Sequence, residues 1–221
     1  MTEDVWTAVD QYLADVIIKP DAALDAALAS SGEAGLPAIN VSPALGKLLM
    51  IFARLRGARR ILEIGTLGGY SAIWMAQGLA PGGKLTSLEI DPKHADVARK
   101  NLERAGVAQL VEIRLGPALE TLPRLGEAKA GPYDLVFIDA DKQSNADYFA
   151  WAVRLTEPGA LIIVDNVIRK GQVIDAQSED AAVQGVRRLN ETMAKERGVL
   201  VTELQTVGLK GYDGIAIALR V

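Results

Sequence analysis

The sequence contains no cysteine and one histidine, His94. The absence of cysteine excludes disulfides, thiolate metal sites and a cysteine nucleophile. With one histidine as well, a zinc site is disfavoured, so any bound metal should be a hard cation with oxygen ligands. His94 follows Asp91-Pro92, a pair typical of a helix start, and we interpret it as a solvated surface residue.

Positive charge and long apolar runs are also lacking. Lys and Arg number 24 against 28 Asp and Glu, a net charge of −4, so no basic field favours nucleic acid or an anionic membrane. No run approaches the ~18 apolar residues of a membrane span, and no signal peptide is visible. We expect a cytoplasmic protein that does not bind membranes.

Hydrophobic residues make up 49% of the 221 residues, which fits one α/β domain over 1–221. Residues 1–57 are predicted to form helices that pack on the rest of the domain. Apolar residues recur at helical spacing from Val5 to Val16, and Ser42-Pro43 suits an N-cap and first turn.

From Arg60 on, short apolar runs alternate with amphipathic helical stretches. The runs span 61–64, 85–90, 111–115, 135–138 and 161–164, and the helices span 70–79, 92–105, 118–125 and 145–155. Such runs are typical of parallel strands buried on both faces. After a helix at 181–197, segments 200–207 and 214–219 share a short link and should pair antiparallel. We predict a doubly wound, Rossmann-like sheet.

Two features at strand ends indicate a nucleoside site, because open α/β sheets bind ligands there. EIGTLGGYS, from Glu63 to Ser71, is a glycine-rich strand-to-helix turn, although it lacks the G-x-G-x-x-G spacing of dinucleotide enzymes. Glu89 ends the second strand, where a carboxylate can accept hydrogen bonds from both ribose hydroxyls. A tight turn that needs glycine for geometry alone is the alternative.

The fourth and fifth strands end in FIDADK (137–142) and VDN (164–166). Asp139, Asp165 and Asn166 therefore share one rim, where two carboxylates and an amide oxygen form a plausible half-shell for Mg²⁺. Helix capping is the alternative role for such acidic residues.

Together these three motifs resemble those of the cation-dependent class I O-methyltransferases, which use S-adenosylmethionine and include the catechol and caffeoyl-CoA enzymes and bacterial relatives. The likeness runs from about Val41 to Gly214. It implies a seven-stranded sheet whose last strand is antiparallel, and usually a homodimer, for which the apolar face from Val5 to Val16 is suited. It also implies methyl transfer to a vicinal-diol small molecule, such as a catechol or a hydroxycinnamoyl compound, with Mg²⁺, Mn²⁺ or Ca²⁺.

The resemblance also assigns roles to individual residues. Those implied to contact the cofactor are Val41, Glu63, Gly65 and Ser71 around its methionine part, Glu89 at the ribose, Ala118 at the adenine, and Asp139. Those implied to bind the metal are Asp139, Asp165 and Asn166, and Lys142 matches the general base, a solvated lysine being the alternative.

This chain departs from the family pattern on the substrate side. Asn145 stands where many members have tyrosine, and Arg169-Lys170 where many have tryptophan. The two added cations raise the question of an anionic substrate. A tRNA hydroxyuridine methyltransferase of the same family, a nucleotide-dependent oxidoreductase and a non-catalytic binding module are the competing hypotheses.

Overall fold

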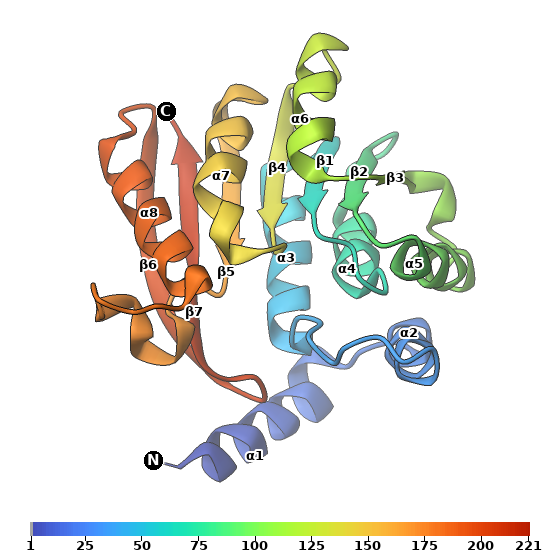
Figure 1. The fold of residues 1–221 in the computed structure, drawn as a ribbon. Coiled ribbons are helices and arrows are strands. Elements are labelled where there is room, and N and C mark those ends of the chain that lie inside the picture. The colour runs from blue at the N-terminus through green and yellow to red at the C-terminus, as the bar shows by residue number, and fades with distance from the viewer. Residues whose placement is uncertain (1) are drawn as a thin grey trace.

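Seven strands form the central sheet of the protein, whose computed structural model describes residues 2–221 (Figure 1). They are β1 (Arg60–Ile64), β2 (Lys84–Glu89), β3 (Val111–Leu115), β4 (Tyr133–Ile138), β5 (Thr156–Asp165), β6 (Val199–Gly208) and β7 (Gly211–Arg220). The strand order is β3-β2-β1-β4-β5-β7-β6, and β7 alone runs in the direction opposite to the other six strands. The predicted doubly wound sheet with an antiparallel last strand is confirmed.

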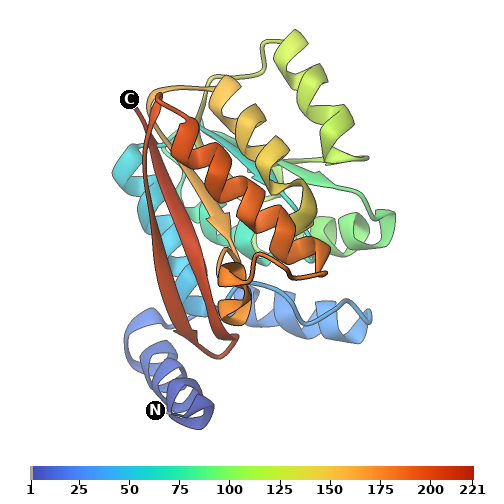
Figure 2. The same cartoon turned by 60° about the vertical axis from the view of Figure 1, so that its left-hand side comes forward.

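Helices cover both faces of this sheet. They are α1 (Glu3–Leu13), α2 (Ala22–Glu33), α3 (Pro43–Arg56), α4 (Tyr70–Gly78), α5 (Pro92–Arg104), α6 (Ala118–Glu127), α7 (Asn145–Arg154) and α8 (Ala181–Lys195). Helices α6, α7 and α8 lie in front of the sheet in Figure 1, and α3 and α4 lie behind it. Figure 2 shows the long β6–β7 hairpin at the sheet edge, with its tip beside α1. Within residues 2–221, no helix combines the length and apolar character needed to cross a membrane.

The strand side chains alternate between two hydrophobic cores. On β4, Leu135 and Phe137 join the core that contains Trp74 of α4, whereas Val136 and Ile138 join the core that contains Phe149 of α7. Fully burying a side chain of this size stabilises the fold by roughly 1.5–3 kcal/mol. Burial on both faces explains why the strands are apolar runs without a polar alternation.

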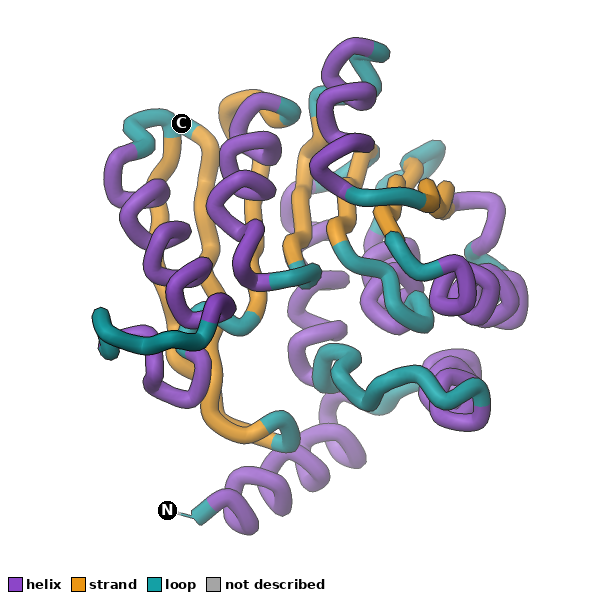
Figure 3. The backbone as a smooth tube through the Cα atoms, in the orientation of Figure 1, coloured by secondary structure: helices purple, strands orange, loops and turns teal. Residues whose placement is uncertain are grey.

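Helix α3 begins at Pro43, as predicted, and Met1 lies outside the described residues. Ser42 caps α3, since its hydroxyl accepts the backbone N–H of Leu45 at 3.2 Å. The connection 34–42 between α2 and α3 runs as an extended loop beneath the sheet (Figure 3). It faces the carboxyl ends of the parallel strands, which is where open α/β sheets bind ligands.

Candidate active site at the carboxyl end of the sheet

A cavity of about 950 Å³ opens at the carboxyl ends of the parallel strands. Its floor is formed by the glycine-rich turn 65–68 and by residues 139–143 after β4. Residues 36–41 of the α2–α3 connection form the opposite wall. A volume at the upper end of the ordinary range for small-molecule sites can hold an elongated ligand together with a second small molecule.

The turn after β1 brings its backbone close to the end of β4 at the cavity. Gly65 has φ 101°, a conformation that favours glycine because it has no Cβ. A Cβ at Gly65 would also collide with the backbone oxygen of Asp139. The turn and the end of β4 can therefore approach each other only with glycine at this position.

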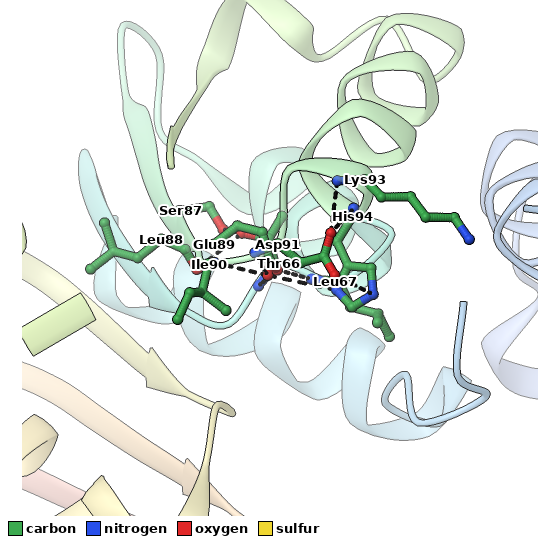
Figure 4. Close-up of polar contacts among 9 residues, drawn as sticks. All are labelled: Thr66, Leu67, Ser87, Leu88, Glu89, Ile90, Asp91, Lys93 and His94. Atoms are coloured by element: carbon green, nitrogen blue, oxygen red, sulfur yellow. Dashed lines mark hydrogen bonds and ion pairs between the residues drawn. The ribbon is translucent and has the colours of Figure 1, made fainter. Parts of the chain in front are cut away.

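Glu89 fixes the turn from the end of β2 (Figure 4). Its Oε2 accepts the N–H groups of Thr66 at 3.1 Å and Leu67 at 2.7 Å, and its Oε1 accepts those of Ile90 and Asp91, each at 2.9 Å. The carboxylate lines the cavity although the residue is only 6% exposed. It is thus held rigidly by four backbone N–H groups, and hydroxyl donors from a ligand would share its two oxygens with them.

Glu63 lies behind the cavity wall. Ser71 Oγ donates to Glu63 Oε1 and Ser87 Oγ donates to Oε2, each at 2.5 Å. Burial raises the pKa of Glu63 to about 8, against the opposing effect of the hydrogen bonds from Ser71 and Ser87. Glu63 therefore supports Ser71, which does line the cavity.

The other end of the cavity is acidic. Lys142 Nζ lies 2.6 Å from Asp139 Oδ1, and the Lys142 side chain is only 11% exposed. Burial and, next, the negative charge of Asp139 raise the pKa of Asp165 to about 7, while Lys142 acts in the opposite direction. Two carboxylates compete here for one ammonium group, so the site favours an additional cation.

The donors at this end suit a hard divalent cation. Asp139 and Asp165 offer carboxylate oxygens, and Asn166, whose φ is 62°, offers an amide oxygen from the rim of the cavity. Residues 2–221 contain no group of three His, Cys, Asp or Glu side chains suited to a metal, so the set depends on Asn166. Oxygen-only ligands of this kind fit Mg²⁺, Mn²⁺ or Ca²⁺.

Comparisons with known proteins identify the family of this chain. A protein-family model described as O-methyltransferase matches residues 24–221. The chain is 52% identical over 219 residues to a catechol O-methyltransferase of Niastella koreensis, covering 99% of both. The chain belongs to the O-methyltransferase family.

Two solved structures of this family superpose closely on the chain. The O-methyltransferase from Bacillus cereus, in complex with S-adenosylhomocysteine, is 52% identical, with a TM-score of 0.98 and 100% of both chains covered. The O-methyltransferase TomG from Streptomyces achromogenes, involved in tomaymycin synthesis and solved with S-adenosylmethionine, is 48% identical with a TM-score of 0.96. That match covers 100% of this chain and 99% of TomG.

In the methyltransferase, most of the residues predicted from sequence line the one cavity. They are Val41, Gly65, Ser71, Glu89, Ala118, Asp139, Lys142 and Asn166. Glu63 and Asp165 are buried behind the wall. Asp141, rather than Asp139, caps the turn that follows β4, because it accepts the N–H of Ser144.

His94 lies in the wall of the cavity. The prediction that it is a solvated surface residue was wrong: its side chain is 22% exposed and lines the cavity, with Nδ1 3.6 Å from Glu89 Oε1. The sequence offered one indication of this role. His94 lies in the first turn of α5, directly after the end of β2, which faces the ligand site. The fold brings this turn back over the carboxylate that ends β2.

Asn101, a buried residue of α5, also supports the site and was not among the predicted residues. Its Nδ2 donates to the Gly68 carbonyl at 2.9 Å, and its Oδ1 accepts from Ser30 Oγ at 2.5 Å and from Arg104 Nη1 at 2.9 Å. Asn101 thus links the glycine-rich turn to α2, which contributes Ser31 to the cavity wall. An asparagine within an amphipathic helix gave no indication of this role.

Proposed function

We propose that this O-methyltransferase transfers the methyl group of S-adenosylmethionine to a hydroxyl of a catechol-like small molecule, with the help of a divalent cation. One observation carries the proposal: a single cavity joins a carboxylate suited to ribose, Glu89, to an acidic end that contains Lys142. Relatives named catechol O-methyltransferase, and family structures solved with S-adenosylmethionine or its demethylated product, support it.

The methyl donor would occupy the end of the cavity near Glu89. The ribose hydroxyls would donate to Glu89, and the adenine would lie beside Ala118, which lines the same end. The methionine part would contact the backbone at Gly65 and the hydroxyl of Ser71, with Val41 above it. The sulfonium methyl would then face the acidic end.

The acceptor would occupy the acidic end, where Asp139, Asp165 and Asn166 would hold the cation. A bound divalent cation supplies Lewis-acid chemistry, since it can orient two neighbouring hydroxyl oxygens and lower the pKa of one. Lys142, whose Nζ lies 2.6 Å from Asp139 Oδ1, stabilises the developing oxyanion or accepts the proton of the hydroxyl group.

The reaction balances without an oxidant or reductant. The hydroxyl oxygen forms a bond to the methyl carbon as the sulfur–carbon bond breaks, and the sulfur keeps the electron pair. The proton of the hydroxyl passes to the neutral form of Lys142 or to water, and the neutral thioether S-adenosylhomocysteine is released. Because attack is in line, holding donor and acceptor in one cavity should supply much of the rate.

The decisive experiment is methyl transfer from labelled S-adenosylmethionine to caffeic acid, with added Mg²⁺ and with excess chelator. We expect transfer that requires the metal. Transfer unaffected by the chelator would contradict the metal role. Stabilisation against heat by NAD(P)H but not by S-adenosylmethionine would instead favour the oxidoreductase hypothesis.

A further inference from the structure

Arg169 is a cationic side chain in the cavity wall that has no partner for its charge. It follows β5, three residues beyond Asn166, and lines the same cavity. Within residues 2–221 its guanidinium group forms no ion pair or hydrogen bond, and Nε is buried without a partner. A buried N–H group left unpaired is costly, and the guanidinium group, which has no partner within the chain, can donate to a ligand in the cavity.

The other charged side chains of the cavity are already engaged. Glu89 accepts four backbone N–H groups and lies beside His94. Asp139 pairs with Lys142. Asp141 accepts the hydroxyl of Tyr148 at 2.5 Å and the N–H of Ser144 at 3.2 Å. Among the charged side chains that line the described cavity, Arg169 is therefore the one with neither a hydrogen bond nor an ion pair.

The nearest acidic residue on β7 does not compensate Arg169 either. Asp213 Oδ1 accepts the backbone N–H groups of Ile168, Arg169 and Gly214, each at 3.0 Å. These bonds hold Arg169 at φ 53°, a left-handed conformation that is costly for a residue with a Cβ. The carboxylate thus fixes the backbone at Arg169 and leaves the guanidinium group for the cavity.

Lys170 differs from Arg169 although the two are adjacent. Lys170 is exposed and takes no part in the cavity wall. Of the two cations that distinguish this chain, only Arg169 can contact an acceptor. Lys170 consequently serves as a matched control, with the same charge sign and a similar left-handed φ of 56°.

We propose that Arg169 selects acceptors that carry a carboxylate on the side of the ring away from the reacting hydroxyls. The proposal rests on the proposed function and names its substrate class, a carboxylated catechol. A planar guanidinium can donate two parallel hydrogen bonds to a carboxylate, which gives both affinity and orientation. An uncharged catechol would leave Arg169 unpaired.

The test compares caffeic acid with its methyl ester, which has the same ring and hydroxyls but no carboxylate. With S-adenosylmethionine and Mg²⁺, we expect wild-type kcat/KM to favour the acid. Arg169→Met should lower kcat/KM for the acid about 10- to 100-fold, the size of a charged hydrogen bond, and change that for the ester by no more than about twofold. Arg169→Lys should give an intermediate loss, because it keeps the charge without the fork, and Lys170→Met should change neither acceptor.

The remaining outcomes distinguish a failure of the proposed selectivity from a failure of the proposed function. Equal wild-type kcat/KM for acid and ester, or an equal loss of both in Arg169→Met, would overturn the selectivity of Arg169 while leaving methyl transfer intact. Absence of transfer to both acceptors would contradict the proposed function and the selectivity with it. Arg169→Met retains the backbone bonds to Asp213, and an unchanged Tm would confirm that the variant is folded.

Discussion

Replacing Glu63 by glutamine should change how the stability of the protein depends on pH. The Glu63 carboxyl is fully buried, and its pKa is raised from 4.5 to about 8, chiefly by burial. Glutamine resembles the protonated carboxyl in shape and offers one acceptor and one donor group. The hydroxyls of Ser71 and Ser87 can adapt, because the bond between Ser87 and Thr66 can run in either direction.

The raised pKa of Glu63 determines whether its contribution to stability rises or falls with pH. Between pH 4.5 and about 8 the folded protein binds the Glu63 proton more tightly than the unfolded chain does. This contribution to stability is complete below pH 4.5 and is lost as the pH rises through about 8. The loss approaches roughly 1.4 kcal/mol per pH unit inside this window, or at most about 2–3 kcal/mol over two pH units.

The assay is urea-induced unfolding of both proteins at about pH 5.5, 6.5 and 7.5, a series inside the window of the linkage. We expect the free energy of unfolding of Glu63→Gln minus that of the wild type to increase steadily with pH. Taking this difference cancels other groups that titrate in the same range, Asp165 included. Glu103→Gln, an exposed change on α5, should give a difference that does not vary with pH. A constant difference for Glu63→Gln as well would refute the reasoning.

Three further predictions concern the site and the assembly. Lys142→Met should lower kcat about 100-fold or more, as expected on losing a general base. Calorimetry should show that the affinity for S-adenosylmethionine stays within about threefold of wild type. Full turnover by the variant would exclude a catalytic role for Lys142. Asn101→Leu should raise KM for S-adenosylmethionine about 3- to 10-fold with little change in kcat, because the Gly68 carbonyl loses a buried hydrogen bond; steady-state kinetics distinguish this from a general loss of activity. We also expect a homodimer, since Val9 and Leu204 are 49% and 51% exposed on adjoining elements α1 and β6; Leu204→Lys should shift the mass in light scattering to that of a monomer.

The fold could be predicted closely because each of its elements has a local pattern. Apolar runs gave the five parallel strands, and the short link at 208–213 gave the antiparallel pair. Element ends were less predictable, since β5 begins at Thr156 and not near Leu161. Glu157, Pro158 and Gly159 are exposed, so nothing in the hydrophobic pattern marks them as part of a strand.

The site was predictable where a residue follows a strand directly. Glu89, Asp139 and Asn166 occupy such positions, and the sheet brings their ends together. Residues that reach the cavity from elsewhere were not predictable in this way. Asn101 acts through a carbonyl 33 residues away in the chain, and the burial of Glu63 behind Ser71 depends on packing that no local pattern encodes.

The strand order sets the distance between the two ends of the cavity. β1 lies between β2 and β4, and its register pairs Ile64 with Leu88 on one side and with Ile138 on the other. The same ladder continues past the strand ends: Gly65 donates to the Leu88 carbonyl at 3.0 Å, and Asp139 donates to the Ile64 carbonyl at 2.9 Å. The glycine-rich turn is therefore held between the carboxylate suited to the ribose and the acidic end. On the proposed function, the sheet would fix the positions of donor and acceptor, and the segment after β5 would determine the choice of acceptor. We therefore expect Arg169→Met to alter selectivity without moving the methyl donor.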